Sequence, residues 1–130
     1  MSYTIREMIS EKEVDERIGE IAEAINRDYA GREISLVCVL KGGVMFMCEL
    51  PKRITVPVTL DFMSVSSYGS GTESSGVVKI IKDLDETVEG REVLVVEDII
   101  DSGRTLSYLL NMLRGRGAKS VRLCTLLERN

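Results

Sequence analysis

The sequence predicts an α/β fold in which a mostly parallel, twisted sheet is flanked by helices. Runs of β-branched and apolar residues recur along the chain and are typical of strands covered on both faces. Helical patterns stand between these runs, at the spacing of right-handed βαβ crossovers. The chain has 130 residues, of which 44% are hydrophobic and 29% charged. This length suits one domain, so we expect residues 1–130 to form a single unit.

The first elements are a surface helix and a buried strand. Ser10 is expected to cap the helix, with Glu13 reaching back to it in a capping box. Apolar residues then recur at helical spacing from Val14 to Tyr29, and Gly31 follows as a stop signal. Continuous apolar runs predict strands at 34–40, 56–65, 93–96 and 121–127.

Shorter elements fill the intervals between these strands. A short apolar helix is expected from Val44, shortened by Pro51, with Met45 and Met47 in the core rather than at an interface. A leucine stripe predicts a helix at 102–114. Residues 66–76 are rich in Gly, Ser and Thr, and the apolar run 77–82 returns from them as an antiparallel strand. We expect a functional loop at 66–76, although a plain hairpin tip is the alternative.

Composition excludes several classes of function. The chain carries 17 Lys and Arg against 21 Asp and Glu, a net charge of −4, which argues against nucleic-acid binding. It has no histidine, which excludes a Ser-His-Asp triad, a Cys-His pair and a His-ligated metal. Three cysteines without C-x-x-C spacing indicate buried thiols in a reducing compartment. We see no signal peptide and no membrane-spanning run, so we expect a cytoplasmic protein without a membrane partner.

The strongest motif is LVVEDIIDSGRTL at residues 94–106, where a buried strand leads into acidic residues and a helix start. The turn at Ser102–Thr105 offers backbone N–H groups and two hydroxyls, which can hold a phosphate. Glu97 and Asp98 suit sugar hydroxyls or Mg²⁺ as partners. Together these groups describe a site for a ribose 5-phosphate, with Asp101 placed to exchange a proton above the C1 atom of the ribose.

A purely structural explanation of this motif is the alternative. Asp101 and Ser102 would then be ordinary helix caps, and Glu97 and Asp98 would lie in a solvated loop. Capping accounts for Ser102 but does not explain two carboxylates at the end of a buried strand, so we favour the functional interpretation.

A second motif, Lys41-Gly42-Gly43, follows the first buried strand. Glycine lets the backbone approach a ligand closely, and the lysine supplies a cation at the same edge of the sheet. A plain strand-to-helix turn explains this motif nearly as well when it is taken alone. Neither a Walker sequence nor a G-x-G-x-x-G helix start occurs, so ATPase and Rossmann dinucleotide-binding functions are excluded.

These segments resemble a known family. VLVVEDIIDSGRTL at 93–106 is similar to the phosphoribosyl pyrophosphate (PRPP) signature of the type I phosphoribosyltransferases. VLKGG, DFMSVSSYGSGT and VVEDIIDSGRTL, in this order, resemble the bacterial hypoxanthine-guanine phosphoribosyltransferases, over about Ile5 to Glu128. The resemblance implies a type I core with a protruding flexible hairpin loop and a homo-oligomer, a dimer or a tetramer. It also implies a Mg²⁺-dependent reaction that joins a purine base at N9 to the C1 atom of PRPP, forming IMP or GMP and pyrophosphate.

The resemblance also implies roles for individual residues. Lys41 and Gly42 would form the pyrophosphate loop, with a cis peptide before the lysine. Asp101 would be the catalytic acid or base facing the purine N7. The remaining implied groups are the ribose and magnesium ligands Glu97 and Asp98, the 5′-phosphate loop of Asp101, Ser102, Gly103, Arg104 and Thr105, and the lid residues Ser67 and Tyr68.

The resemblance further implies a C-terminal segment beyond the strand at 121–127. In the family this segment builds much of the hood over the purine, and we expect the present sequence to lack it. The leading hypothesis is therefore a purine-salvage transferase, and the alternative is a PRPP- or nucleotide-binding module without turnover, or an inactive fragment. A receiver-type signalling domain also places acidic pairs at strand ends. Here a helix start of the phosphate-binding type follows the acidic residues directly, which argues against a receiver domain.

Overall fold

The computed structural model describes residues 10–67, 78–100 and 104–128. Helices and strands alternate along most of these residues, as the sequence predicts. In chain order the elements are α1 (Glu11–Asp28), β1 (Ile34–Leu40), α2 (Val44–Glu49), the 3₁₀ helix η1 (Pro51–Arg53), β2 (Val58–Ser67), β3 (Val78–Lys82), β4 (Glu92–Ile100), α3 (Arg104–Gly115) and β5 (Ser120–Glu128).

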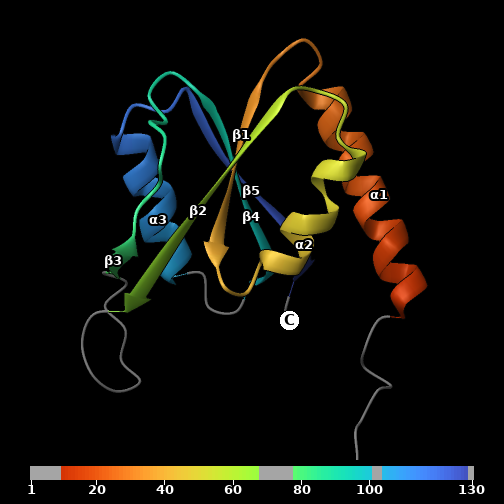
Figure 1. The fold of residues 1–130 in the computed structure, drawn as a ribbon, viewed down its shortest axis with the longest axis horizontal. Helices are drawn as coiled ribbons and strands as arrows, with labels where there is room; N and C mark the ends of the chain where they lie inside the picture. The colour runs from red at the N-terminus through yellow and green to blue at the C-terminus, as the bar shows by residue number, and fades with distance from the viewer. Residues whose placement is uncertain (1–9, 68–77, 101–103, 129–130) are drawn as a thin grey trace, which may run out of the picture.

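The strands form one five-stranded sheet in the order β3-β2-β1-β4-β5 (Figure 1). β1 pairs in parallel with both β2 and β4, and β4 pairs in parallel with β5. β3 runs antiparallel to β2, at one edge of the sheet. The mostly parallel sheet and the antiparallel return strand are thus both confirmed. Because β1 and β4 are parallel neighbours, the loops that follow them meet at one edge of the sheet.

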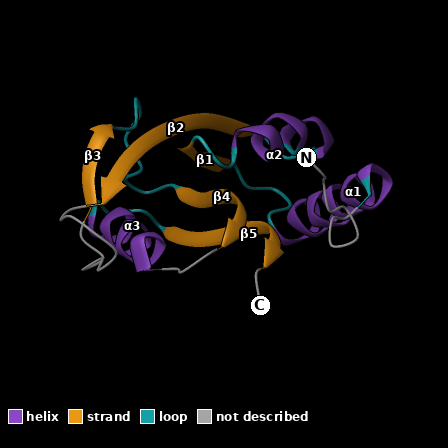
Figure 2. Cartoon of the chain, turned by 90° about the horizontal axis from the view of Figure 1, so that it is seen from below, coloured by secondary structure: helices purple, strands orange, loops and turns teal. Residues whose placement is uncertain are grey.

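Helices cover both faces of the sheet (Figure 2). α1 and α2 lie on one face, where Leu36 of β1 and Leu94 of β4 join the core that they cover. α3 lies on the other face, where its Leu109 and Leu113 pack with residues such as Val93. The sheet therefore separates two apolar layers, which explains why the central strands read as continuous apolar runs.

Two strands differ in extent from the sequence prediction. β2 begins at Val58 rather than at Val56, because Pro57 has no N–H to donate and the ladder with β1 starts at the pair Ile34 and Val58. β4 continues through the acidic residues to Ile100, because its pairing with β5 extends to Glu128. Strand length here follows the neighbouring strand rather than the apolar run.

The helix signals at the N-terminus are confirmed. Ser10 Oγ accepts a hydrogen bond of 3.1 Å from the N–H of Glu13, and the Glu13 side chain accepts from the N–H of Ser10. α1 ends at Asp28, and Gly31 follows with a φ of 78°, a conformation that favours glycine. Among the described residues, no helix is long and apolar enough to cross a membrane.

The burial predicted for the methionines of α2 and for the cysteines is confirmed in part. Met47 is buried as expected, but the prediction of a core position for Met45 is wrong, since 74% of its surface is exposed. α2 has only six residues, so just one side of it reaches the sheet. Cys38 and Cys124 are buried, as expected of thiols within apolar strands, whereas Cys48 is exposed.

Candidate functional site

The turn after β1 and the end of β4 lie together at the carboxyl edge of the sheet, at the bottom of Figure 1. The peptide bond between Leu40 and Lys41 is cis, as the resemblance implies. The turn leads at once into α2, whose N-cap is Gly43. Lys41 itself is exposed, so its ammonium group is accessible to a ligand at this edge.

The glycines let this turn approach β4 closely. A β-carbon added to Gly43 would lie 2.9 Å from the carbonyl oxygen of Val96 and 3.4 Å from the Cys38 Sγ atom. A β-carbon on Gly42 would lie 3.4 Å from Glu97 Oε1 and 3.7 Å from Asp98 Oδ1. The turn thus passes close to both carboxylates, which confirms that the two motifs meet in space.

The electrostatics of this edge disfavour negative charge. Burial raises the pKa of Glu97, and the neighbouring carboxylate of Asp98 raises it further. The pKa of Cys38 rises to about 11, first because the thiol is buried and then because both carboxylates lie nearby. The site therefore favours a ligand that brings positive charge or hydrogen-bond donors to the carboxylates, as a magnesium ion or sugar hydroxyls would.

The structure describes only some residues of the expected 5′-phosphate loop and lid. α3 starts at Arg104, close behind the end of β4, and Thr105 is half-buried in its first turn. Asp101, Ser102 and Gly103 lie outside the described residues. So does Tyr68, whereas Ser67 is the last residue of β2. The phosphate-loop and lid assignments therefore remain predictions.

The acidic pair suits a hard cation by its chemistry. Carboxylate oxygens are the protein ligands that Mg²⁺ prefers, and Mg²⁺ commonly takes only one or two of them alongside water and substrate phosphates. Within residues 10–67, 78–100 and 104–128, no group of three or more acidic or cysteine side chains is arranged to hold a metal. By the chemistry of their oxygens, Glu97 and Asp98 fit a magnesium ion.

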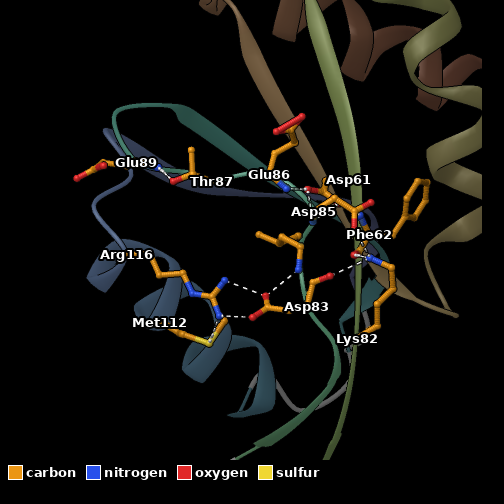
Figure 3. A network of polar contacts seen from close by, with 11 residues as sticks. Asp61, Phe62, Lys82, Asp83, Asp85, Glu86, Thr87, Glu89, Met112 and Arg116 are labelled. Carbon is orange, nitrogen blue, oxygen red and sulfur yellow. Dashed lines mark hydrogen bonds and ion pairs between the residues drawn. The ribbon is translucent and has the colours of Figure 1, made fainter.

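A second set of carboxylates, on β2 and in the β3–β4 connection, is stabilised in the charged form by its hydrogen-bond donors (Figure 3). The buried carboxylate of Asp61 accepts hydrogen bonds from the N–H groups of Phe62, Asp85 and Glu86, at 2.9–3.1 Å. Burial alone would raise its pKa, but these donors and the charge of Lys82 outweigh burial and lower the pKa. The carboxylate thus stays charged and fastens the connection to the sheet.

An exposed ion pair continues this network. Arg116, which follows α3, donates to both carboxylate oxygens of Asp83 at 2.8 and 2.9 Å, and this contact lowers the pKa of Asp83. Lys82 donates to the carbonyl oxygens of Phe62 and Asp83 at 2.9 and 2.8 Å. None of these contacts is predicted by the sequence, since a charged residue carries no local signal of which distant groups it will meet in the fold.

Comparisons with known proteins agree with the site. The family profile of the phosphoribosyl transferase domain matches residues 7–130. The chain is 57% identical over 122 residues to the bifunctional protein TilS/HprT of Listeria monocytogenes, covering 94% of the chain and 19% of that protein. It is 50% identical to the hypoxanthine-guanine phosphoribosyltransferase of Streptococcus thermophilus, covering 94% of the chain and 68% of that enzyme.

A solved structure gives the same result. A hypoxanthine-guanine phosphoribosyltransferase from Bacillus anthracis superposes with a TM-score of 0.89 at 45% identity, covering 95% of this chain and 73% of that one. The chain thus spans about a fifth of the Listeria protein and about two thirds to three quarters of the other two. With its fold, its paired motifs and these similarities, the chain belongs to the phosphoribosyltransferase family, among relatives of the hypoxanthine-guanine type.

Proposed function

We propose that the chain carries the PRPP-binding core of a purine-salvage enzyme, with residues 1–130 as a single unit. The reaction transfers the phosphoribosyl group of PRPP to hypoxanthine or guanine and yields IMP or GMP and pyrophosphate. One observation carries the proposal: the Lys41–Gly43 turn lies against Glu97 and Asp98 at the carboxyl edge of the sheet. A cation and two carboxylates at this edge match a substrate with phosphate at one end and sugar hydroxyls at the other.

Binding and orientation are the main tasks of these residues. Lys41 and the exposed N–H groups of the turn would hold the pyrophosphate as it leaves the ribose C1 atom. Glu97 and Asp98 would accept hydrogen bonds from the ribose hydroxyls, and residues 101–105 would hold the 5′-phosphate. Asp101 would exchange a proton with the purine at N7 while N9 bonds to C1. Ser67 and Tyr68 would lead a loop that excludes water from the reacting carbon.

Magnesium is part of the proposal. Glu97 and Asp98 would hold the ion together with oxygens of PRPP, and the ion would offset the charge of the departing pyrophosphate. The raised pKa of Glu97 supports this assignment, because a cation would relieve the repulsion between the two carboxylates.

We also propose a cytoplasmic homo-oligomer. Met45 on α2 and Leu60 on β2 are 74% and 48% exposed. Leu60 pairs in register with Leu36, so it faces the side of the sheet that carries α2. Exposed apolar residues on one face favour contact with a second copy. Analytical ultracentrifugation of the chain and of Met45→Lys tests this: the variant should dissociate, and an unchanged mass would place the contact elsewhere.

The deciding experiment measures pyrophosphate release by the purified 130-residue chain with Mg²⁺, PRPP and hypoxanthine, guanine or xanthine in turn. Turnover with hypoxanthine or guanine is the expected result, and the preferred base defines the substrate. PRPP binding without turnover would support the alternative, a binding module or an inactive fragment. If the chain bound no PRPP, the assignment of the Lys41 turn and the acidic pair would be wrong.

A further inference from the structure

A polar pocket of about 270 Å³ lies at the amino edge of the sheet, at the top of Figure 1. Its walls come from residues that precede three neighbouring strands: Arg32 and Glu33 before β1, Gly90 and Arg91 before β4, and Lys119 before β5. These strands pair with one another, so the pocket lies between paired strands rather than along an outer edge of the sheet. β1 has seven residues at about 3.3 Å each, which places the pocket roughly 20 Å from the Lys41 turn, in a separate part of the protein.

Ser35 gives this pocket a buried hydroxyl. The residue lines the pocket and is only 7% exposed, although it is the second residue of the otherwise apolar strand β1. Thr59 on β2 is its hydrogen-bond partner, with 3.3 Å between the two hydroxyl oxygens. A hydroxyl can donate one hydrogen bond and accept two, so Ser35 keeps capacity for a ligand in the pocket.

The charges around the pocket are only partly balanced within the protein. Arg32 neutralises the buried Glu92, because it donates to both carboxylate oxygens at 3.0 and 2.9 Å. Arg91 is half-buried and Lys119 is exposed, and neither forms an ion pair in the described parts of the chain. The exposed carboxylate of Glu33 has no ion pair there either. Two cations and one carboxylate are therefore left to contact a ligand.

We propose that this pocket binds the phosphate monoester of a small polyol. Arg91, Lys119 and the Ser35 hydroxyl donate hydrogen bonds to the phosphate oxygens. Glu33 repels a bare phosphate but accepts from hydroxyl groups, so it selects a ligand that carries hydroxyl donors as well. The pocket is smaller than the about 300–1,000 Å³ typical of drug-sized ligands, so the polyol has only a few carbon atoms. This inference does not depend on the transferase reaction.

Titrations of the whole chain followed by amide NMR test the proposal. Glycerol 3-phosphate is the probe, and inorganic phosphate, sulfate and glycerol are the comparison ligands. We expect millimolar binding of glycerol 3-phosphate, with shifts centred on residues 32–35, 90–92 and 119. Inorganic phosphate and sulfate should bind about fivefold more weakly, the effect of one hydrogen bond, and glycerol should produce no shifts at these residues.

Substitution of the arginine tests the phosphate contact. Arg91→Gln should weaken binding of glycerol 3-phosphate about tenfold, because a charge-assisted hydrogen bond is lost. The midpoint of urea unfolding and the rate of pyrophosphate release should stay unchanged, since the side chain has no ion pair to lose and lies far from the Lys41 turn. Arg122→Gln, which removes an exposed arginine outside the pocket, is the matched control and should alter none of these quantities.

Two further variants separate the two ends of the ligand. Ser35→Ala should weaken glycerol 3-phosphate and inorganic phosphate equally, about fivefold, because the hydroxyl contacts the phosphate that both ligands share. Glu33→Gln should bring the affinities of the two ligands to within about twofold of each other, because it removes both the repulsion of bare phosphate and the charged acceptor for the hydroxyls. Urea unfolding of each variant checks that the fold is retained.

Several outcomes would overturn the proposal. Equal affinity of the unsubstituted chain for glycerol 3-phosphate, inorganic phosphate and sulfate would show a patch of positive charge without selectivity for an ester. Equal weakening by Arg91→Gln and Arg122→Gln would lead to the same conclusion. Shifts confined to residues 41–43 and 97–98 would mean that the probe uses only the site proposed for PRPP, which would leave the proposed function intact. Conversely, a chain that bound no PRPP but gave the expected shifts at the amino edge would retain this pocket and lose the transferase assignment.

Discussion

Two carboxylates of one sheet, Asp61 on β2 and Glu97 on β4, differ in how the fold treats their charge. Asp61 is 7% exposed, yet backbone donors keep its pKa below the ordinary value. Glu97 is half-buried, and burial together with the charge of Asp98 raises its pKa. The fold supplies three backbone donors to the first charge, whereas the second has one, the N–H of Asp98, and the like charge of Asp98 beside it.

This difference separates a structural carboxylate from one that is available to a ligand. A carboxylate that already accepts three N–H groups has little capacity left for a substrate, whereas one that lies beside a like charge gains from any cation or donor. A site tuned for a ligand is commonly less stable than it would be if rebuilt without function. We therefore expect substitution of Asp61 to lower the stability of the protein, and substitution of Glu97 to weaken ligand binding while raising the stability.

The largest expected effect is on catalysis. Asp101→Asn should lower kcat about 10²–10⁴-fold, because the amide cannot exchange a proton with the purine. PRPP binding and the free energy of unfolding should change little. Pyrophosphate release and isothermal titration with PRPP measure the two quantities. Lost PRPP binding would make this residue structural, like Asp61, and would break the comparison.

Next in size is the effect of Asp61→Ala on stability. The substitution leaves the N–H groups of Phe62, Asp85 and Glu86 without their acceptor, so the free energy of unfolding should fall by about 2–4 kcal/mol. Since the pKa of Asp61 is lowered in the folded protein, its contribution is present above the ordinary aspartate pKa. It is lost as the pH falls through the folded value. Urea unfolding between pH 3 and 7 should therefore show the two proteins converging in acid.

Whether the sequence predicts the surroundings of each carboxylate depends on how far apart the interacting residues are along the chain. The strand, acidic pair and helix start at 93–106 are continuous in the chain, so their order predicted the location of Glu97 and Asp98 at the carboxyl edge. To predict that Gly42 lies near these carboxylates needed only the rule that the loops after neighbouring parallel strands meet at one edge of the sheet. Asp61 meets the N–H groups of Asp85 and Glu86 some 24 and 25 positions away, and no local pattern encodes that meeting.

The prediction of where helices and strands end has the same limit: local interactions can be predicted from the sequence, and contacts with distant segments cannot. Ser10 and Glu13 form a local cap, and the sequence predicted it. β4 continues past its apolar run because β5 lies beside it, which is a property of the neighbour. The exposure of Met45 likewise depends on how short α2 is and on what it faces.

Lys41→Ala tests the ligand side of the comparison. Loss of a charge-assisted contact should weaken PRPP and pyrophosphate binding about 10- to 100-fold, and nucleoside monophosphate binding much less. Titration calorimetry with all three ligands gives the ratio. Lys79→Ala, on β3 and also exposed, serves as the control. Equal weakening of all three ligands would contradict the role of Lys41 in holding pyrophosphate.

The change in stability caused by Glu97→Gln should have the opposite sign from that caused by Asp61→Ala. Because the pKa of Glu97 is raised, its charged form destabilises the folded protein increasingly as the pH rises above the ordinary glutamate pKa. The variant should therefore be more stable at pH 7 by about 0.5–2 kcal/mol, with no difference near pH 3. It should also bind PRPP and Mg²⁺ more weakly. A destabilised variant at pH 7 would show that Glu97 belongs with Asp61.

The smallest effect concerns the exposed pair of Arg116 and Asp83, whose side chains are 34% and 48% accessible. A double-mutant cycle with Arg116→Ala and Asp83→Asn should give a coupling of about 0.2–1 kcal/mol, since solvent screens such pairs. The coupling should shrink further in 1 M salt. A coupling above 2 kcal/mol would mean that the surface pair, not the buried Asp61, holds the connection before β4. The cycle therefore decides whether burial with backbone donors, or charge pairing alone, distinguishes this carboxylate network from the one at the ligand edge.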